Sequence, residues 1–150
     1  MEFKALDQVD LKLLRLLQEN ARLSYSDLAR HVGLTAPAVT ERIRKLEHAG
    51  IIQGYQASLD LRQLGFDVQA LILIEVAYKD EQAFMRYVKE KRAVLECHHL
   101  LGQSAFSLKV CVQKMLDLEA LIRELMKFGQ TTTHILLSEV VRQSPVDLQP

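Results

Sequence analysis

The chain has 150 residues, of which 49% are hydrophobic, so it is long enough for one ordinary domain or two small ones without disulfides or metal ions. Lysine plus arginine equals aspartate plus glutamate at 19 each, which excludes the strongly basic composition that most simply indicates nucleic-acid binding. Charges near the start, and a longest apolar run of only "ALILI" at 70–74, predict neither a signal peptide nor a membrane span, so we expect a cytoplasmic location.

The first third of the chain is predicted to be helical. In "DQVDLKLLRLLQEN" leucines recur between charged residues with helical spacing, and Asp7 is a suitable N-cap. The segment "SYSDLARHVG" repeats these signals, because Ser24 or Ser26 can cap a second helix and Gly33 can end it with a positive φ. Two short helices are therefore expected before residue 34.

The second and third helices have the spacing of a DNA-binding helix-turn-helix. Thr35 is the expected N-cap of the third helix, and Pro37 lies in its first turn, where a missing N–H costs no hydrogen bond. Ala29 allows the helices to approach, Gly33 makes the turn, and Val39 packs the third helix against the second. An ordinary corner between two helices would show the same spacing, so this alternative stays open.

The geometry of the third helix predicts which side meets DNA. Val39, Ile43 and Leu46 follow the i, i+4, i+7 pattern of a buried stripe, so the opposite side is exposed. Small residues at the start of the helix permit close approach to base edges, and Arg44 can offer two parallel donors to guanine or bind a phosphate. The candidate DNA contacts are Ser24, Ser26, Thr35, Ala36, Pro37, Thr40, Glu41, Arg44 and Lys45.

Local charge supports this assignment only modestly. Glu41 and Lys45 have the spacing of an ordinary i, i+4 helix pair on a solvated face, which is the alternative for these two residues. Phosphate binding needs several contacts at once, so an assembly that presents several such helices is expected. Residues 30–48 carry an excess of two positive charges, with Arg30, Arg42, Arg44 and Lys45 against Glu41 and Glu47.

From Ile51 the pattern changes to short β-rich runs that alternate with two amphipathic helices. A strand is expected in "IIQGYQASL", and the remainder has the order β-α-β-β-α-β, with a turn at Gly102 and a last strand in "TTTHILLSEVVR". This order is that of the ferredoxin-like fold, an antiparallel sheet with both helices on one face. The natural linker is "LDLRQLGFD" at 59–67, and we expect the tail after Arg142 to be loose.

The whole chain resembles the Lrp/AsnC family, the feast/famine transcriptional regulators. The segments "LQENAR", "LARHVGL", "VTERIRKLE" and "AGIIQGY" carry the resemblance in this order. It implies an α+β protein with a helix-turn-helix (winged-helix-like) domain at 1–52, and a strand and linker at 53–66 that pair across a dimer. It further implies a ferredoxin-like domain at 67–150 that forms a dimeric α+β barrel, assembles into octamers and binds a small amino acid between dimers.

The effector site departs from the pattern of the family. There, the hairpin turn resembles Gly, two variable residues, Asp and an aromatic residue, and the carboxylate holds the ammonium of the amino acid. Here "GQSAF" places Ala105 at the acidic position, which makes burial of an ammonium less favourable, although backbone N–H groups of such a turn can hold a carboxylate. The candidate effector residues are His99, Gly102, Gln103, Ser104, Ala105, Thr131 and Thr133, with an ordinary turn and strand as the alternative.

Metal, cofactor and catalytic sites have no support in the sequence. His98 and His99 are adjacent in a predicted strand and point to opposite faces, and Cys97 and Cys111 lack further ligands. Neither a nucleophile motif nor a phosphate-binding loop is present. The predicted function is DNA-binding transcriptional regulation without a cofactor. One alternative is a DNA-organising protein without an effector. The other is a small dimeric α+β barrel enzyme, which would need a cluster of polar groups inside the barrel, whereas the residues expected to point inward here are mainly apolar.

Overall fold

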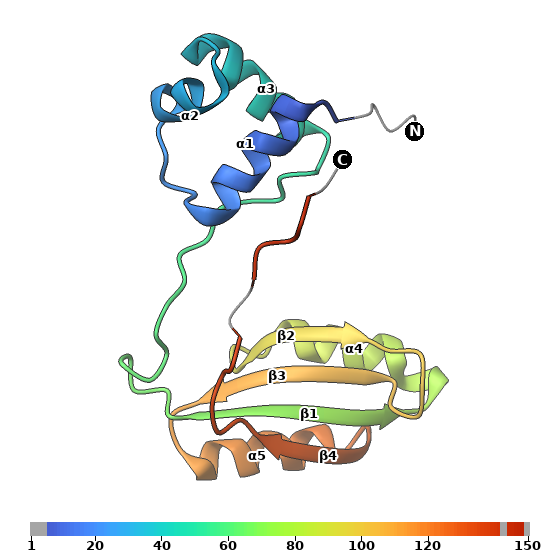
Figure 1. Ribbon diagram of the computed structural model, residues 1–150. Coiled ribbons are helices and arrows are strands. Elements are labelled where there is room, and N and C mark those ends of the chain that lie inside the picture. Colours follow the sequence, from blue (N-terminus) through green and yellow to red (C-terminus); the bar gives the residue numbers. More distant parts are fainter. Residues whose placement is uncertain (1–5, 142–143, 149–150) are drawn as a thin grey trace. The chain divides into compact units, whose positions relative to one another are not determined.

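The computed structural model describes residues 6–141 and 144–148, which form two compact units (Figure 1). The N-terminal unit comprises residues up to Ser58 together with the chain from Val141 onward, and the C-terminal unit comprises Leu59–Val140. Among the described residues, no helix is both long and apolar enough to cross a membrane.

Three helices build the N-terminal unit: α1 (Gln8–Glu19), α2 (Tyr25–Val32) and α3 (Ala36–His48). As predicted, Asp7 caps α1 by accepting the N–H of Asp10 at 2.8 Å. Leucines on one side of α1 and α2 meet the buried stripe of α3, so the three helices share one small apolar core. Its fully buried members are Leu13, Leu28, Val39 and Ile43, with Ala29 beside them.

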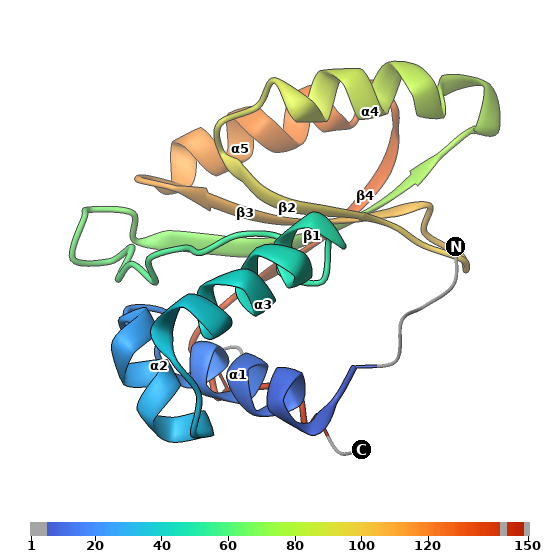
Figure 2. The ribbon, with the colours of Figure 1, turned by 90° about the horizontal axis from the view of Figure 1, so that it is seen from above.

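The C-terminal unit has the predicted β-α-β-β-α-β order. Its strands pair antiparallel in the order β2-β3-β1-β4, and both helices cover the same face of the sheet (Figure 2). The elements are β1 (Val68–Val76), α4 (Glu81–Lys89), β2 (Val94–His99), β3 (Phe106–Val112), α5 (Met115–Leu125) and β4 (Gly129–Ile135), with a short 3-10 helix at Tyr78–Asp80. The ferredoxin-like architecture is thus confirmed.

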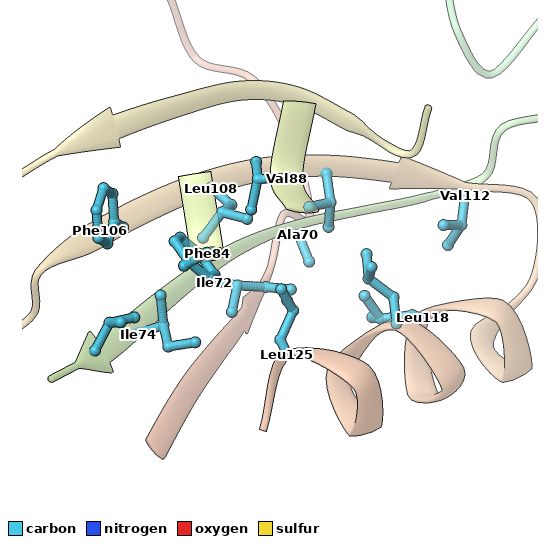
Figure 3. Close-up of a cluster of buried hydrophobic side chains, with 13 residues drawn as sticks. Ala70, Ile72, Ile74, Phe84, Val88, Phe106, Leu108, Val112, Leu118 and Leu125 are labelled. Atoms are coloured by element: carbon cyan, nitrogen blue, oxygen red, sulfur yellow. The ribbon is translucent and has the colours of Figure 1, made fainter. Parts of the chain in front are cut away.

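The core of this unit lies between the sheet and its two helices (Figure 3). Alternate residues of β1 point to the helices because side chains of a strand alternate between faces, and Ile72 and Ile74 are fully buried. Phe84 from α4 packs against Phe106, with ring centroids 4.8 Å apart. At the edge of the sheet, a Cβ atom on Gly129 would lie 1.6 Å from the carbonyl oxygen of Glu75, so this close approach of β4 to β1 requires glycine.

Residues 51–59 pair with no segment of the same chain, so the strand that was expected to pair across a dimer stays a prediction. Two expectations about the end of the chain are wrong. The last strand begins at Gly129 and ends at Ile135 instead of continuing to residue 142. The tail was predicted to be loose, but Gln18 in α1 accepts the N–H of Val146 at 2.7 Å and donates to its carbonyl oxygen at 3.3 Å. Residues 142–143 and 149–150 lie outside the described part of the chain.

Candidate nucleic-acid interface and effector region

The turn between α2 and α3 is built by local hydrogen bonds. The hydroxyl of Ser24 accepts the N–H of Asp27 at 3.1 Å and donates to its carboxylate at 2.6 Å, so the candidate DNA contact Ser24 is occupied as a cap. Gly33 ends α2 with a φ of 70°, a value that glycine adopts without strain. Thr35 caps α3 by accepting the N–H of Ala38 at 3.4 Å. These bonds fix the direction in which α3 leaves the turn.

The sides of α3 are divided as the helical spacing predicts. Val39 and Ile43 are fully buried, and Leu46 is nearly so. On the opposite side, Arg44 and Lys45 expose 58% and 65% of their side chains. The hydroxyl of Thr40 donates to the carbonyl oxygen of Ala36 and is exposed. The remaining candidates are also at the surface, with Ser26, Thr35 and Pro37 exposed and Ala36 and Glu41 half-buried.

One carboxylate on this face holds two cations. Glu41 accepts hydrogen bonds from Nε and Nη2 of Arg44 at 3.1 Å and 3.0 Å, and Nζ of Lys45 lies 3.6 Å from it. The hydrogen bond from Arg44 is the main cause that lowers the pKa of Glu41, so the carboxylate is ionised at neutral pH. The ordinary helix pair between Glu41 and Lys45 is therefore present, and Arg44 belongs to the same cluster.

Arg42 does not belong to the exposed face, although the sequence count included it in the local positive charge. Its guanidinium donates to the carboxylates of Asp7 and Asp10 at 2.7 Å each, with 32% of its side chain exposed. The N–H of Asp10 and then Arg42 lower the pKa of Asp7. Arg30 is paired with Asp27. Asp7, Asp10 and Asp27 pair with these two arginines, so counting them removes the local excess of two positive charges.

The end of α3 is connected to the segment that follows it. The hydroxyl of Tyr55 donates to the carboxylate of Glu47 at 3.0 Å. Burial, followed by this hydrogen bond, raises the pKa of Tyr55 to about 12, so the hydroxyl keeps its proton. No sequence pattern indicated this contact. It holds the segment after residue 52 against the last turn of α3.

The candidate effector turn is closed by backbone hydrogen bonds. Ala105 donates its N–H to the carbonyl oxygen of Ile74 at 2.9 Å and accepts the N–H of Leu100 at 2.7 Å. Of the backbone N–H groups of the turn that were expected to be able to hold a ligand carboxylate, that of Ala105 is therefore already taken within the sheet. Gly102 and Gln103 are exposed, and Ser104 is half-buried, so the turn itself is open to ligand.

Two of the other candidates share one row across the sheet. His99 pairs with Phe106, Phe106 with Ile74, and Ile74 with Thr131, so His99 and Thr131 lie on the two edge strands with two strands between them. The ring of His99 stacks on Phe106 with centroids 4.6 Å apart. Thr133 pairs with Ile72, one step further along the strands. The structure therefore places these residues on both edges of the sheet and not around one point.

A carboxylate that sequence reasoning missed lies beside the turn. Nε2 of Gln103 donates to Oε1 of Glu75 at 3.3 Å. Glu75 is exposed and is the only charged residue of "VQALILIEV", and this interruption of an apolar strand was the signal that could have identified it. Its neighbours in β1 point alternately to the helices and away from them, and Glu75 lies on the face away from the helices.

The sheet face away from the helices is more polar than the sequence predicted. Lys109 on β3 lies 4.0 Å from Glu96 on β2 and 3.4 Å from Glu139. Next to them, Nε2 of His98 lies 3.3 Å from Glu96. This face, whose side chains were expected from the sequence to be mainly apolar, therefore carries several ion pairs. In the described part of the chain, however, no three His, Cys, Asp or Glu residues are grouped so as to hold a metal ion.

Comparison with known proteins gives matches over nearly the whole chain. Residues 6–47 match the AsnC-type helix-turn-helix domain, and residues 69–146 match the Lrp/AsnC ligand-binding domain. The HTH-type transcriptional regulator LrpC of Bacillus subtilis is 33% identical over 90% of this chain and 94% of its own. The leucine-responsive regulatory protein of Rhizobium meliloti is 30% identical over 92% of this chain and 90% of its own.

Solved structures agree with these matches. The structure of LrpC from Bacillus subtilis superimposes with a TM-score of 0.86 at 32% identity, covering 93% of this chain and 99% of that chain. A transcriptional regulator of Neisseria meningitidis in complex with L-methionine has a TM-score of 0.88 at 27% identity, covering 96% and 97%. Both the helical unit and the sheet unit thus have counterparts in single proteins.

Proposed function

The chain belongs to the Lrp/AsnC family of helix-turn-helix transcriptional regulators, and on this premise we propose that it binds operator DNA through the exposed side of α3. The observation that carries the proposal is the division of α3 into a buried stripe and an exposed side with two cations in the C-terminal half of the helix. Its relatives are named transcriptional regulators, and the proposed role is regulatory and not enzymatic, acting in the cytoplasm.

The proposed contacts follow from how deeply each part of α3 would enter the major groove of DNA. Thr35, Ala36 and Pro37 at the start of α3 are small and lie closest to base edges, while Arg44 reaches guanine or phosphate from the exposed side. Because so few cations face outward, one helix is too weakly charged to hold DNA alone, and binding as a dimer or octamer supplies the further contacts. In this proposal residues 53–66 pair across the dimer and residues 67–150 bind the effector and assemble.

Selection of duplexes from a random pool tests the DNA-binding proposal. The purified full chain is incubated with random-sequence duplexes at low salt, bound duplexes are amplified, and the enriched sequence is titrated by fluorescence anisotropy. We expect one motif repeated with a spacing of about one or more helical turns, because a symmetric assembly presents pairs of α3 helices. Enrichment of no motif, together with equal binding to every duplex, would instead support a DNA-organising protein.

A free amino acid is the proposed effector. The relative from Neisseria meningitidis is solved with L-methionine, and in this chain Glu75, bonded to Gln103, provides a carboxylate beside the turn where Ala105 provides none. An ammonium group is stabilised by such a charge. The exposed Gly102 and Gln103 leave the turn open to a small molecule.

A thermal-shift screen of the twenty amino acids measures this binding. We expect one or a few to raise the melting temperature, because a ligand at about 100 times its dissociation constant adds about 2.7 kcal/mol of stability. Glu75→Gln should remove most of the shift, whereas Glu90→Gln, an equal charge change at the exposed end of α4, should keep it. Equal shifts in both variants would show that the ammonium is held elsewhere, and light scattering on the same samples reports whether the ligand changes the assembly.

A further inference from the structure

The acidic residue in the middle of the exposed side of α3 is placed where a DNA-binding surface is expected to be positive. The carboxylate of Glu41 has 46% of its side chain exposed, beside Arg44 and Lys45. Both cations come from the next turn of the helix and direct their donors at this one carboxylate. Glu41 therefore lowers the positive potential at the point where it would be most useful for binding phosphate.

The neutralisation extends to every other cation of residues 30–48. Arg30 is paired with Asp27, and Arg42 with Asp7 and Asp10. Attraction to the DNA backbone without regard to sequence depends on cations that are free to replace counterions around the phosphates. Because each cation here already has a carboxylate within a few ångströms, which is well inside the screening length of about 8 Å at physiological salt, sequence-independent attraction is weak.

The geometry of the Arg44 pair leaves a recognition edge open. A guanidinium has five N–H donors in a planar fork. Glu41 occupies the edge made by Nε and Nη2, at 3.1 Å and 3.0 Å. Nη1 and the second hydrogen of Nη2 form the opposite edge, and two parallel donors on such an edge match O6 and N7 of guanine. The carboxylate thus fixes the plane of the guanidinium while the end that faces away from it stays free.

We propose that Glu41 is a specificity-determining residue, which suppresses binding to DNA of arbitrary sequence and orients Arg44 for one base. This inference rests on the proposed function of α3. Removing the negative charge releases Arg44 and Lys45 to any phosphate, so affinity for arbitrary duplexes rises. At the selected duplex the released charge is offset by the loss of orientation, so affinity changes little or falls.

The expected signature is a fall in the ratio of specific to non-specific affinity. For Glu41→Gln we expect binding to a scrambled duplex to become about 3- to 10-fold tighter, which corresponds to one additional phosphate contact at moderate salt. The slope of log affinity against log salt for that duplex should steepen by about 0.9. Affinity for the selected duplex should stay the same or decrease, so the ratio falls by roughly 3-fold or more.

The experiment compares three variants of the full chain on the selected and the scrambled duplex, by fluorescence anisotropy at several salt concentrations. Glu19→Gln is the matched control, because it makes the same charge change at the exposed end of α1. It should change the affinity for both duplexes by the same small factor. Glu41→Gln combined with Arg44→Ala should lose most of the gain on the scrambled duplex, since that gain comes largely from the released Arg44. Melting curves confirm that each variant is folded.

The outcomes separate this inference from the proposed function. If Glu41→Gln, like Glu19→Gln, changes the affinity for both duplexes equally, the ratio of specific to non-specific affinity is unchanged. This result overturns the role of Glu41 and leaves the proposed DNA binding by α3 intact. A larger gain in affinity for the selected duplex than for the scrambled one in Glu41→Gln also overturns it. If the unmodified chain binds no duplex, the proposed function itself fails, and the inference with it.

Discussion

Replacing Arg44 by alanine should weaken binding to the selected duplex by roughly ten- to a hundredfold, because a bidentate contact from arginine to guanine contributes about 1–3 kcal/mol of discrimination. Arg44 exposes 58% of its side chain and is not among the buried residues of the core, so the variant should keep the fold and its melting temperature. In a symmetric assembly each copy of α3 loses the same contact. The measurement is an anisotropy titration at about 150 mM salt, where weak phosphate binding is suppressed.

Two control variants separate base reading from simple charge. Lys45→Ala removes the neighbouring cation and should lower the affinity for the selected and the scrambled duplex by a similar factor. The reason is that an ammonium is a point charge and lacks the two parallel donors of a guanidinium. Arg44→Lys keeps the charge but loses the parallel donors, so affinity for the selected duplex should fall while the salt dependence is kept. Unchanged affinity of Arg44→Ala for the selected duplex would show that another side of the molecule reads DNA.

Replacing Arg42 by alanine should destabilise the N-terminal unit and, through it, DNA binding. The guanidinium bridges two carboxylates at the start of α1, at 2.7 Å each, and thereby fastens α3 to α1. Without it, Asp7 and Asp10 face each other with no cation between them. We expect the melting temperature of this unit to fall by about 4–8 °C, which corresponds to about 1 kcal/mol in a small domain, and affinity for DNA to fall several-fold because α3 is held less firmly. Arg42→Lys should recover part of the loss, because Nη1 alone makes both hydrogen bonds and an ammonium can supply a positive charge to the two carboxylates.

The same cluster sets a pH dependence. The pKa of Asp7 is lower in the folded chain than in the unfolded chain, because the N–H of Asp10 and the guanidinium of Arg42 stabilise the ionised form. Such a group contributes stability above the unfolded pKa, and the contribution is lost as the pH falls through the folded value. The melting temperature of the N-terminal unit should therefore decrease as the pH is lowered from about 5 to about 3. This decrease should be smaller in Arg42→Ala. An unchanged pH profile in that variant would show that Arg42 adds nothing to the cluster.

Features fixed by neighbouring residues could be predicted from the sequence. Asp7, Ser24 and Thr35 act as caps within three residues of their partners, and Gly33 takes the positive φ that its position requires. Helical spacing in α3 identified its buried side, because apolar residues at i, i+4 and i+7 lie on one face of a helix. The order of the elements then determined the ferredoxin-like unit.

Features that depend on distant residues could not be predicted. Arg42 binds carboxylates 32 and 35 positions away in the sequence. A count of charges over residues 30–48 therefore included it in the local positive charge without the acids that pair with it. The strand predicted at 51–59 has β-forming residues but no neighbouring strand in the chain, and propensity alone forms no ladder. Likewise, nothing in the turn sequence shows that the N–H of Ala105 is bonded to the carbonyl oxygen of Ile74 in β1.

The contact between Val146 and Gln18 makes the C-terminal unit an insertion in the chain of the N-terminal one. The polypeptide leaves the N-terminal unit after Ser58 and returns to it at Val141. The backbone of Val146 then forms hydrogen bonds to Gln18 in α1. Because both partners belong to one polypeptide, the occupancy of this contact is independent of protein concentration and is set by an effective concentration that the intervening chain determines. Cutting the backbone anywhere between these two points would turn a unimolecular closure into a bimolecular one, without altering a single residue of either surface.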